Sequence, residues 1–166
     1  MTEIDEQYMK RAIELAESAA AIDEVPVGAL IVRRGEIIAE AYNTRERDKC
    51  ATCHAELRAI EAACRALGGW RLPESTLYVT LEPCPMCAGA ILHARIDRVV
   101  FGASDPRAGA FGSVLNLNEL ALYHKTELRG GVLGESCSGL LTAYFRRKRE
   151  TKKAPKELQL HEKEHE

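Results

Sequence analysis

The sequence predicts a single α/β domain built from layered helices and strands. Its 166 residues suit one domain that buries its own core without disulfides. With 46% apolar and 29% charged residues, the composition is that of a globular protein. Helical and strand patterns alternate through the middle of the chain, which favours an α/β arrangement. We expect residues 1–150 to form the domain and residues 151–166 to form a polar, flexible tail.

The N-terminal elements are predicted from hydrophobic spacing. Apolar residues recur at helical spacing from Ile4 to about Ala21, which predicts a helix packed on one face. Two β-rich runs, Val27–Val32 and Glu36–Ala41, flank the turn sequence RRG and predict a hairpin. The polar segment Asn43–Thr52 is expected to be a loop.

The remaining elements alternate in type. Ala55–Leu67 predicts a helix, because its apolar residues share one face and Gly68-Gly69 follows as a stop signal. Downstream we expect a strand at Thr76–Leu81, a helix at Cys84–Ala94, a strand at Arg98–Gly102, a strand near Thr126–Leu128 and a C-terminal helix from about Glu135.

Charge and thiol content point to the cytoplasm. The formal net charge is -2, and the N-terminal segment is charged and amphipathic, without the apolar core of a signal peptide. No apolar run is long enough to suggest a membrane span. Thiols stay reduced in the cytoplasm, so the six cysteines are expected to be metal ligands, reactive thiols or small buried residues.

The stretch CATCHAE, residues 50–56, fits three kinds of metal site. The string C-x-x-C-H is the attachment motif of c-type haem, which the expected compartment disfavours. Cys50 and Cys53 could join the C-P-M-C at residues 84–87 in a closed four-cysteine zinc site. His54 could instead join the downstream cysteines in a catalytic zinc site, with Glu56 as its acid/base.

Spacing favours the catalytic arrangement. Cys84 and Cys87 are one helical turn apart, and Pro85 suits the first turn of a helix. Unpaired N–H groups at a helix N-terminus favour the thiolate form that binds metal. Positions two apart face opposite sides in mid-helix, but His54 and Glu56 can both reach a site beyond the first turn. Three protein ligands leave one position for water, whose pKa zinc lowers towards ~7.

The segments CHAELRAI and TLYVTLEPCPMCAGAILHARIDRVVFGA resemble the zinc-dependent cytidine/deoxycytidylate deaminase superfamily, and most closely its bacterial tRNA-specific adenosine deaminases. This resemblance implies a three-layer α/β/α fold around a mixed five-stranded sheet. It also implies a cytoplasmic homodimer with one Zn²⁺ per subunit. Such enzymes convert adenosine to inosine at the wobble position (34) of the tRNA anticodon.

The same resemblance assigns roles to individual residues. It implies that His54, Cys84 and Cys87 bind zinc and that Glu56 is catalytic. The residues implied to contact the anticodon stem-loop are Asn43, Asp105, Tyr144, Phe145, Arg146 and Arg149. Independently, YFRRKRETKKAPK combines rings with basic groups, as RNA bases and phosphates require. The alternative is a solvated helix end whose aromatic residues pack on the core.

Some features depart from the family pattern or leave alternatives open. Cys53 stands where the family has a small residue, and we interpret Cys50 and Cys53 as ordinary loop thiols. The acidic, histidine-bearing end LQLHEKEHE has no assigned role. The alternative activity is deamination of free guanine, or of cytosine or its nucleoside, by the same zinc chemistry. A zinc module that binds RNA without catalysis is disfavoured by the presence of Glu56.

Overall fold

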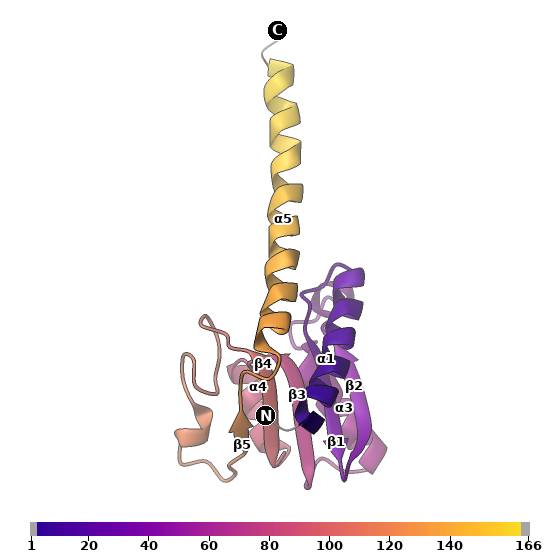
Figure 1. Cartoon of the computed structure of the whole chain (residues 1–166), viewed down its shortest axis with the longest axis vertical. Helices are drawn as coiled ribbons and strands as arrows, with labels where there is room; N and C mark the ends of the chain where they lie inside the picture. The colour runs from indigo at the N-terminus through magenta and orange to yellow at the C-terminus, as the bar shows by residue number, and fades with distance from the viewer. Residues whose placement is uncertain (1–2, 164–166) are drawn as a thin grey trace.

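The strands alternate their side chains between two hydrophobic cores, which makes the fold a three-layer sandwich. The structure, a computed structural model, describes residues 3–163, with side chains described for residues 3–152. In β1, Ala29 and Ile31 face one core, whereas Leu30 and Val32 face the other. Helices α3 and α4 cover the first core, and α1 and the start of α5 cover the second (Figure 1). The predicted α/β/α architecture is confirmed.

The sheet is mixed and five-stranded, with the order β2-β1-β3-β4-β5. The strands are β1 (Gly28–Arg33), β2 (Glu36–Tyr42), β3 (Ser75–Leu81), β4 (Arg98–Ala103) and β5 (Glu127–Arg129). β1 pairs antiparallel with β2 and β3, whereas β3, β4 and β5 are parallel. The predicted hairpin is present, and its turn places Arg34 and Gly35 at positive φ.

The helices agree with the predicted pattern except for two short ones. They are α1 (Glu3–Ala21), α2 (Arg45–Asp48), α3 (Ala55–Leu67), α4 (Pro85–His93), the 3₁₀ helix η1 (Leu117–Glu119) and α5 (Gly134–Lys163). The prediction that residues 43–52 form a loop throughout was therefore wrong, because α2 lies within them. A four-residue helix is too short to show the hydrophobic period on which the prediction depended.

α5 extends away from the sheet after its first turns (Figure 1). The predicted domain boundary at residue 150 falls within this helix, whose backbone continues to Lys163. The flexible tail stays a prediction, and its last three residues lie outside the described ones. No described helix combines the length and apolar character needed to cross a bilayer.

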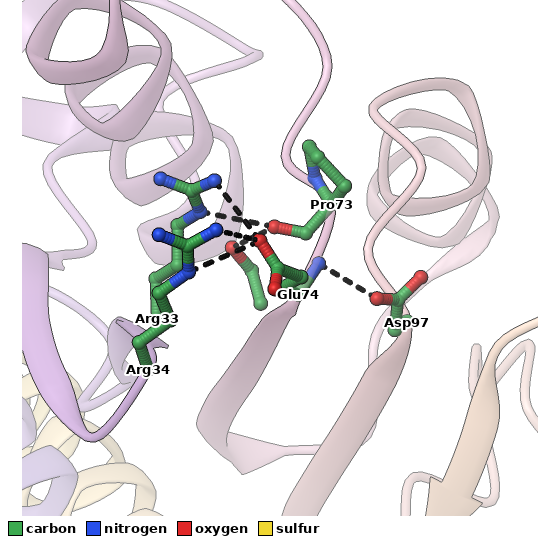
Figure 2. A network of polar contacts seen from close by, with 6 residues as sticks. Arg33, Arg34, Pro73, Glu74 and Asp97 are labelled. Atoms are coloured by element: carbon green, nitrogen blue, oxygen red, sulfur yellow. Dashed lines mark hydrogen bonds and ion pairs between the residues drawn. The ribbon is translucent and has the colours of Figure 1, made fainter.

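A polar network closes the end of the sheet where β1 finishes and β3 and β4 begin (Figure 2). The Glu74 carboxylate accepts from the guanidinium groups of Arg33 and Arg34 of the hairpin turn. The Glu74 backbone N–H donates to the Asp97 carboxylate at 2.7 Å. The loops at this end are thereby tied together, whereas the opposite end, where β2, β3 and β4 finish, is left for the site described next.

Candidate active site and metal centre

His54 is positioned by the start of α3. It is the N-cap residue, with extended backbone angles, and its carbonyl accepts from the Arg58 N–H at 3.1 Å. The preceding polar segment ends in a tight turn in which Cys53 N donates to Cys50 O at 3.2 Å. The His54 ring therefore projects from the end of the helix, as the sequence predicted.

Cys84 and Cys87 are positioned in the same way by α4. Cys84 is the N-cap residue, Pro85 occupies the first turn, and the Ala88 N–H donates to Cys84 O at 2.8 Å. Cys87 is fully buried one turn later. α4 follows β3 almost directly, so both sulfurs lie at the carboxyl end of a parallel strand, where α/β proteins bind ligands.

The three predicted ligand residues meet at one point. His54 Nδ1 lies 3.8 Å from Cys84 Sγ and 3.5 Å from Cys87 Sγ, and all three donor atoms lie within 4.8 Å of one another. Tetrahedral bonds to zinc of about 2.0 Å from nitrogen and 2.3 Å from sulfur separate two such ligands by roughly 3.6 Å. The donor set and its spacing therefore fit a zinc ion.

The electrostatics of the thiols favour metal binding. A hydrogen bond from Cys87, aided by His54, lowers the pKa of Cys84 to about 4 despite its burial. The same contact with Cys84, together with burial, raises the pKa of Cys87. A hydrogen bond with Cys84 raises the pKa of His54 against the effect of burial. The lowered pKa of Cys84 favours its thiolate, the form that ligates metal.

Glu56 lies in the first turn of α3 beside these donors. It is buried, and desolvation raises the pKa of its carboxyl group to about 7, although a backbone hydrogen bond and His54 oppose the shift. Glu56 and His54 line the same cavity despite being two positions apart. A carboxyl group with a pKa near neutrality can both accept and return a proton.

The site opens into a cavity of about 170 Å³. Its lining comprises Val25, Val27, Asn43, Arg45, His54, Glu56, Leu81, Glu82, Cys84, Asp105 and Ala108. The structure therefore brings the predicted residues Asn43 and Asp105 together with the metal donors. Arg45 also lines the cavity, but the sequence did not single it out, because one arginine in a charged segment carries no spacing signal.

Asp105 is held by a second carboxylate that the sequence did not single out. Buried Glu82 accepts from the backbone N–H groups of Asp105, Phe111 and Ser113 at 3.0–3.1 Å, and from the Ser113 hydroxyl. Burial by itself would raise the pKa of Glu82, but these hydrogen bonds together lower it. The Asp105 Oδ1 in turn accepts a hydrogen bond from Arg107 N at 2.9 Å. These bonds hold the loop of residues 105–113 beside the cavity.

The predicted C-terminal residues divide into two groups. Tyr144 and Phe145 line a neighbouring cavity that shares Val25 and Arg45 with the first. Tyr144 is also buried, and its hydroxyl donates to Asp23 O at 3.0 Å. Its ring therefore has the structural role in the core that the sequence left open as the alternative to RNA binding. Arg146 and Arg149 are exposed on α5 and are not among the residues that line these two cavities.

Cys50 and Cys53 stand apart from the donor cluster. Among the described residues, the group that can hold a metal comprises His54, Cys84 and Cys87 alone. Cys50 Sγ instead contacts Thr52 Oγ1 at 3.2 Å, and hydrogen bonds with Thr52 and Cys53 lower the pKa of Cys50. The closed four-cysteine site is therefore not formed, which agrees with two ordinary loop thiols.

Comparisons with known proteins agree with this geometry. The model of the cytidine and deoxycytidylate deaminase zinc-binding region matches residues 2–103. The tRNA-specific adenosine deaminase of Bacillus subtilis (strain 168) is 53% identical over 151 residues, covering 90% of this chain and 94% of the relative.

Solved structures extend the likeness to the fold. A structure from work on A-to-I editing by tRNA:A34 deaminases at the wobble position superposes with a TM-score of 0.78 at 42% identity, covering 81% of this chain and 99% of that one. The guanine deaminase of Nitrosomonas europaea gives a TM-score of 0.74 at 26% identity, with 84% and 83% covered. The chain thus belongs to the family defined by the cytidine and deoxycytidylate deaminase zinc-binding region.

Proposed function

We propose that the chain is a zinc-dependent hydrolase that deaminates adenosine to inosine at the wobble position of tRNA anticodons. The observation that carries the proposal is the cluster of His54, Cys84 and Cys87 beside the buried Glu56, at one cavity. The substrate follows from the curated relative at 53% identity, which is named a tRNA-specific adenosine deaminase.

In this proposal His54, Cys84 and Cys87 hold the zinc ion. When bound, zinc acts as a Lewis acid that makes water acidic enough to attack at neutral pH. Glu56 accepts a proton from the attacking water and delivers it to N1 of the adenine ring, so that C6 becomes electrophilic. Once the water oxygen has bonded to C6, Glu56 takes the second proton from that hydroxyl group and passes it to the amine, so that the C6–N bond breaks, ammonia leaves and a carbonyl remains at C6.

The remaining residues bind the substrate. Asn43 and Asp105 contact the target nucleotide, because both line the cavity beside the metal donors. Phe145 and Tyr144 contact flanking bases from the adjacent cavity, since unstacked anticodon bases bind ring faces. Arg146 and Arg149 contact backbone phosphates from the exposed side of α5, where their charges are free of the core.

The second candidate is deamination of a free base such as guanine. The guanine deaminase of Nitrosomonas europaea favours this candidate, because most of its chain shares the fold of this protein. The basic and aromatic residues of α5 argue for RNA instead, since a free base offers no phosphate to bind.

One experiment separates these activities. Purified protein, assayed first for about one zinc per chain, is incubated with an anticodon stem-loop carrying adenosine at the wobble position, with free guanine and with free cytidine. We expect inosine and ammonia from the stem-loop alone. Ammonia from guanine or cytidine with an unchanged stem-loop would overturn the tRNA assignment.

We also propose that the protein works as a homodimer in the cytoplasm, where tRNA is found. The surface that supports dimerisation is the aromatic patch, defined as Trp70, His93 and Tyr123. Trp70 and Tyr123 are 51% and 62% exposed, and both contact the His93 ring. Aromatic residues are enriched at protein interfaces relative to the rest of the surface.

Sedimentation tests this surface. Trp70→Ala with Tyr123→Ala should shift the protein from dimer to monomer, whereas Ile37→Ala, on the exposed face of β2, should leave the dimer intact. A parent protein that sediments as a monomer would contradict the proposal.

A further inference from the structure

Glu24 is a buried carboxylate for which the proposed reaction has no direct use. It follows the turn after α1, its side chain is fully buried, and its backbone N–H donates to Ala19 O at 3.0 Å. Its Oε1 accepts from the Arg47 backbone N–H at 2.6 Å, and its Oε2 accepts from Asn43 Nδ2 at 3.2 Å. Both partners are uncharged donors, so the placement of the carboxylate depends on hydrogen bonds.

The contact with Asn43 fixes which way its amide points. A side-chain amide can present either its NH₂ or its oxygen, but a carboxylate only accepts hydrogen bonds. The Asn43 NH₂ must therefore face Glu24, which leaves its Oδ1 for the cavity that the residue lines. The backbone is fixed as well, because Asn43 N donates to Val27 O at 3.0 Å.

The second contact ties the same carboxylate to α2. The Arg47 N–H belongs to this short helix, whose Arg45 lines the cavity. The neighbouring residue Asp23 accepts from the Tyr144 hydroxyl of α5 through its backbone oxygen. The turn at residues 23–24 therefore accepts hydrogen bonds from α5, from α2 and from Asn43. All three border the proposed RNA-binding surface.

We propose that Glu24 is a positioning residue that turns the Asn43 amide so that its oxygen is a fixed hydrogen-bond acceptor for the target nucleoside. The substrate group that it receives is a donor, either a ribose hydroxyl or an N–H. This inference rests on the proposed function, since it assigns the acceptor to the nucleoside that is deaminated. A fixed acceptor also discriminates, because an analogue without the donor leaves a buried oxygen unpaired.

Glu24→Gln is the informative change, since it keeps the shape of the side chain. The amide oxygen of the substituted side chain can still accept from Arg47 N, while its NH₂ donates to the Asn43 oxygen. The Asn43 amide then flips, so that its NH₂ faces the cavity. This NH₂ is a donor, and it cannot accept the hydrogen bond that the substrate group donates. We expect kcat/KM for the anticodon stem-loop to fall about tenfold to a hundredfold, with zinc content and Tm close to the parent values. The matched control is Glu61→Gln, on the exposed face of α3, which should leave all three unchanged.

Two further variants separate positioning from a merely structural role. If Glu24 acts through Asn43, Glu24→Gln should cost less than about twofold in an Asn43→Ala background. The exchange of Glu24→Gln with Asn43→Asp restores an acceptor facing the cavity, so its kcat/KM should exceed that of either single variant.

The outcomes distinguish the two proposals. An active parent with an equally active Glu24→Gln variant overturns the positioning role alone. So does a loss that is the same with and without the Asn43 side chain, or an exchange variant poorer than both singles. A zinc-loaded parent that leaves the stem-loop unchanged overturns the proposed function, and the positioning role with it.

Discussion

The side chains of Glu56 and His54 reach the same site because both lie at the start of a helix. In the middle of a helix, residues two positions apart would point to opposite sides. Glu56 and His54 are two positions apart, yet both line one cavity because His54 is the N-cap residue and Glu56 lies in the first turn. Burial then raises the pKa of Glu56 to about 7, within the range useful for proton transfer. The chemistry of the site therefore depends on where α3 begins.

Replacing Glu56 tests this directly. Glu56→Gln keeps the shape of the side chain but removes its ability to accept a proton, so we expect turnover to fall about 10²–10⁴-fold. Zinc content and stem-loop affinity should stay at parent values, because the candidate metal donors and the proposed RNA contacts are untouched. Metal analysis, a binding titration and inosine formation measure the three quantities. Deamination at the parent rate would contradict the role of Glu56.

Other residues at the site could not be found from the sequence. Glu24 follows Asp23 and Glu82 precedes Pro83, and neither lies in a pattern that predicts burial. Their partners are distant, since Glu24 accepts from Asn43 and Glu82 accepts from Ser113. Such pairings arise only when the loops fold against each other.

At the level of elements, the packing of α1 on β1 leaves no room for a side chain at Gly28. A Cβ there would lie 2.1 Å from Ala12 O and 2.5 Å from Ala16 N, both backbone atoms of α1. Backbone of a packed helix cannot yield as the end of a side chain can. The close approach lets Leu15 and Met9 of α1 pack on the sheet.

Gly28→Ala should therefore destabilise the protein by about 1–3 kcal/mol, the usual cost of overpacking. Urea unfolding gives the free energy. The control is Gly139→Ala on α5, where a Cβ meets nothing within 4 Å. It should stabilise the protein by about 0.5–1 kcal/mol, because alanine is the better helix former. A Gly28→Ala protein as stable as the parent would show that α1 can move away from β1.

The ion pair between α1 and β2 predicts a pH effect. Arg11 donates to both oxygens of Glu40, at 2.6 and 3.0 Å, and this contact lowers the pKa of Glu40 below its ordinary 4.5. A lowered pKa in the folded state means that the stabilisation is complete above pH 4.5 and is lost as the pH falls below it. The pair is partly exposed, so solvent screening keeps its contribution small.

We expect Glu40→Gln to destabilise the protein by about 0.5–1 kcal/mol at neutral pH and to have no effect in the acid range. Urea unfolding of the variant and the parent at each pH measures the difference. Glu14→Gln, which removes the more exposed partner of Arg11, should cost less. A penalty for Glu40→Gln that grows as the pH falls would contradict the assigned sign.

For the whole molecule, the sheet order brings two helix starts to one place. α3 enters after β2 and α4 enters after β3, and both cover the same face of the sheet. Their N-cap residues, His54 and Cys84, therefore meet although they are 30 positions apart. A metal bound there links the two helices, so that binding should stabilise the entire fold.

Removing zinc with a chelator should lower the Tm by roughly 10 °C. Zinc added back should restore it. Cys87→Ser should lack both responses, whereas Cys50→Ser with Cys53→Ser should behave as the parent does, because these thiols lie outside the donor group. Differential scanning calorimetry and metal analysis provide the readout. Loss of zinc from the Cys50 and Cys53 variant would revive the four-cysteine site.

The order and type of the long elements, and the candidate metal donors, could be predicted from the amino-acid sequence. A hydrophobic face of helical period predicts α3, a short β-branched run predicts β3, and the spacing of the H-x-E and P-C-x-x-C motifs marks His54 and Cys84 as candidate metal ligands. The short helix α2, the place of Arg45 at the cavity and the hydrogen bond from Asn43 to Glu24 became known from the three-dimensional structure. Spacing along the chain encodes contacts within one helix or strand, where the residues are near in sequence. A buried hydrogen bond between loops joins residues far apart in sequence, so it depends on how the strands between them pack.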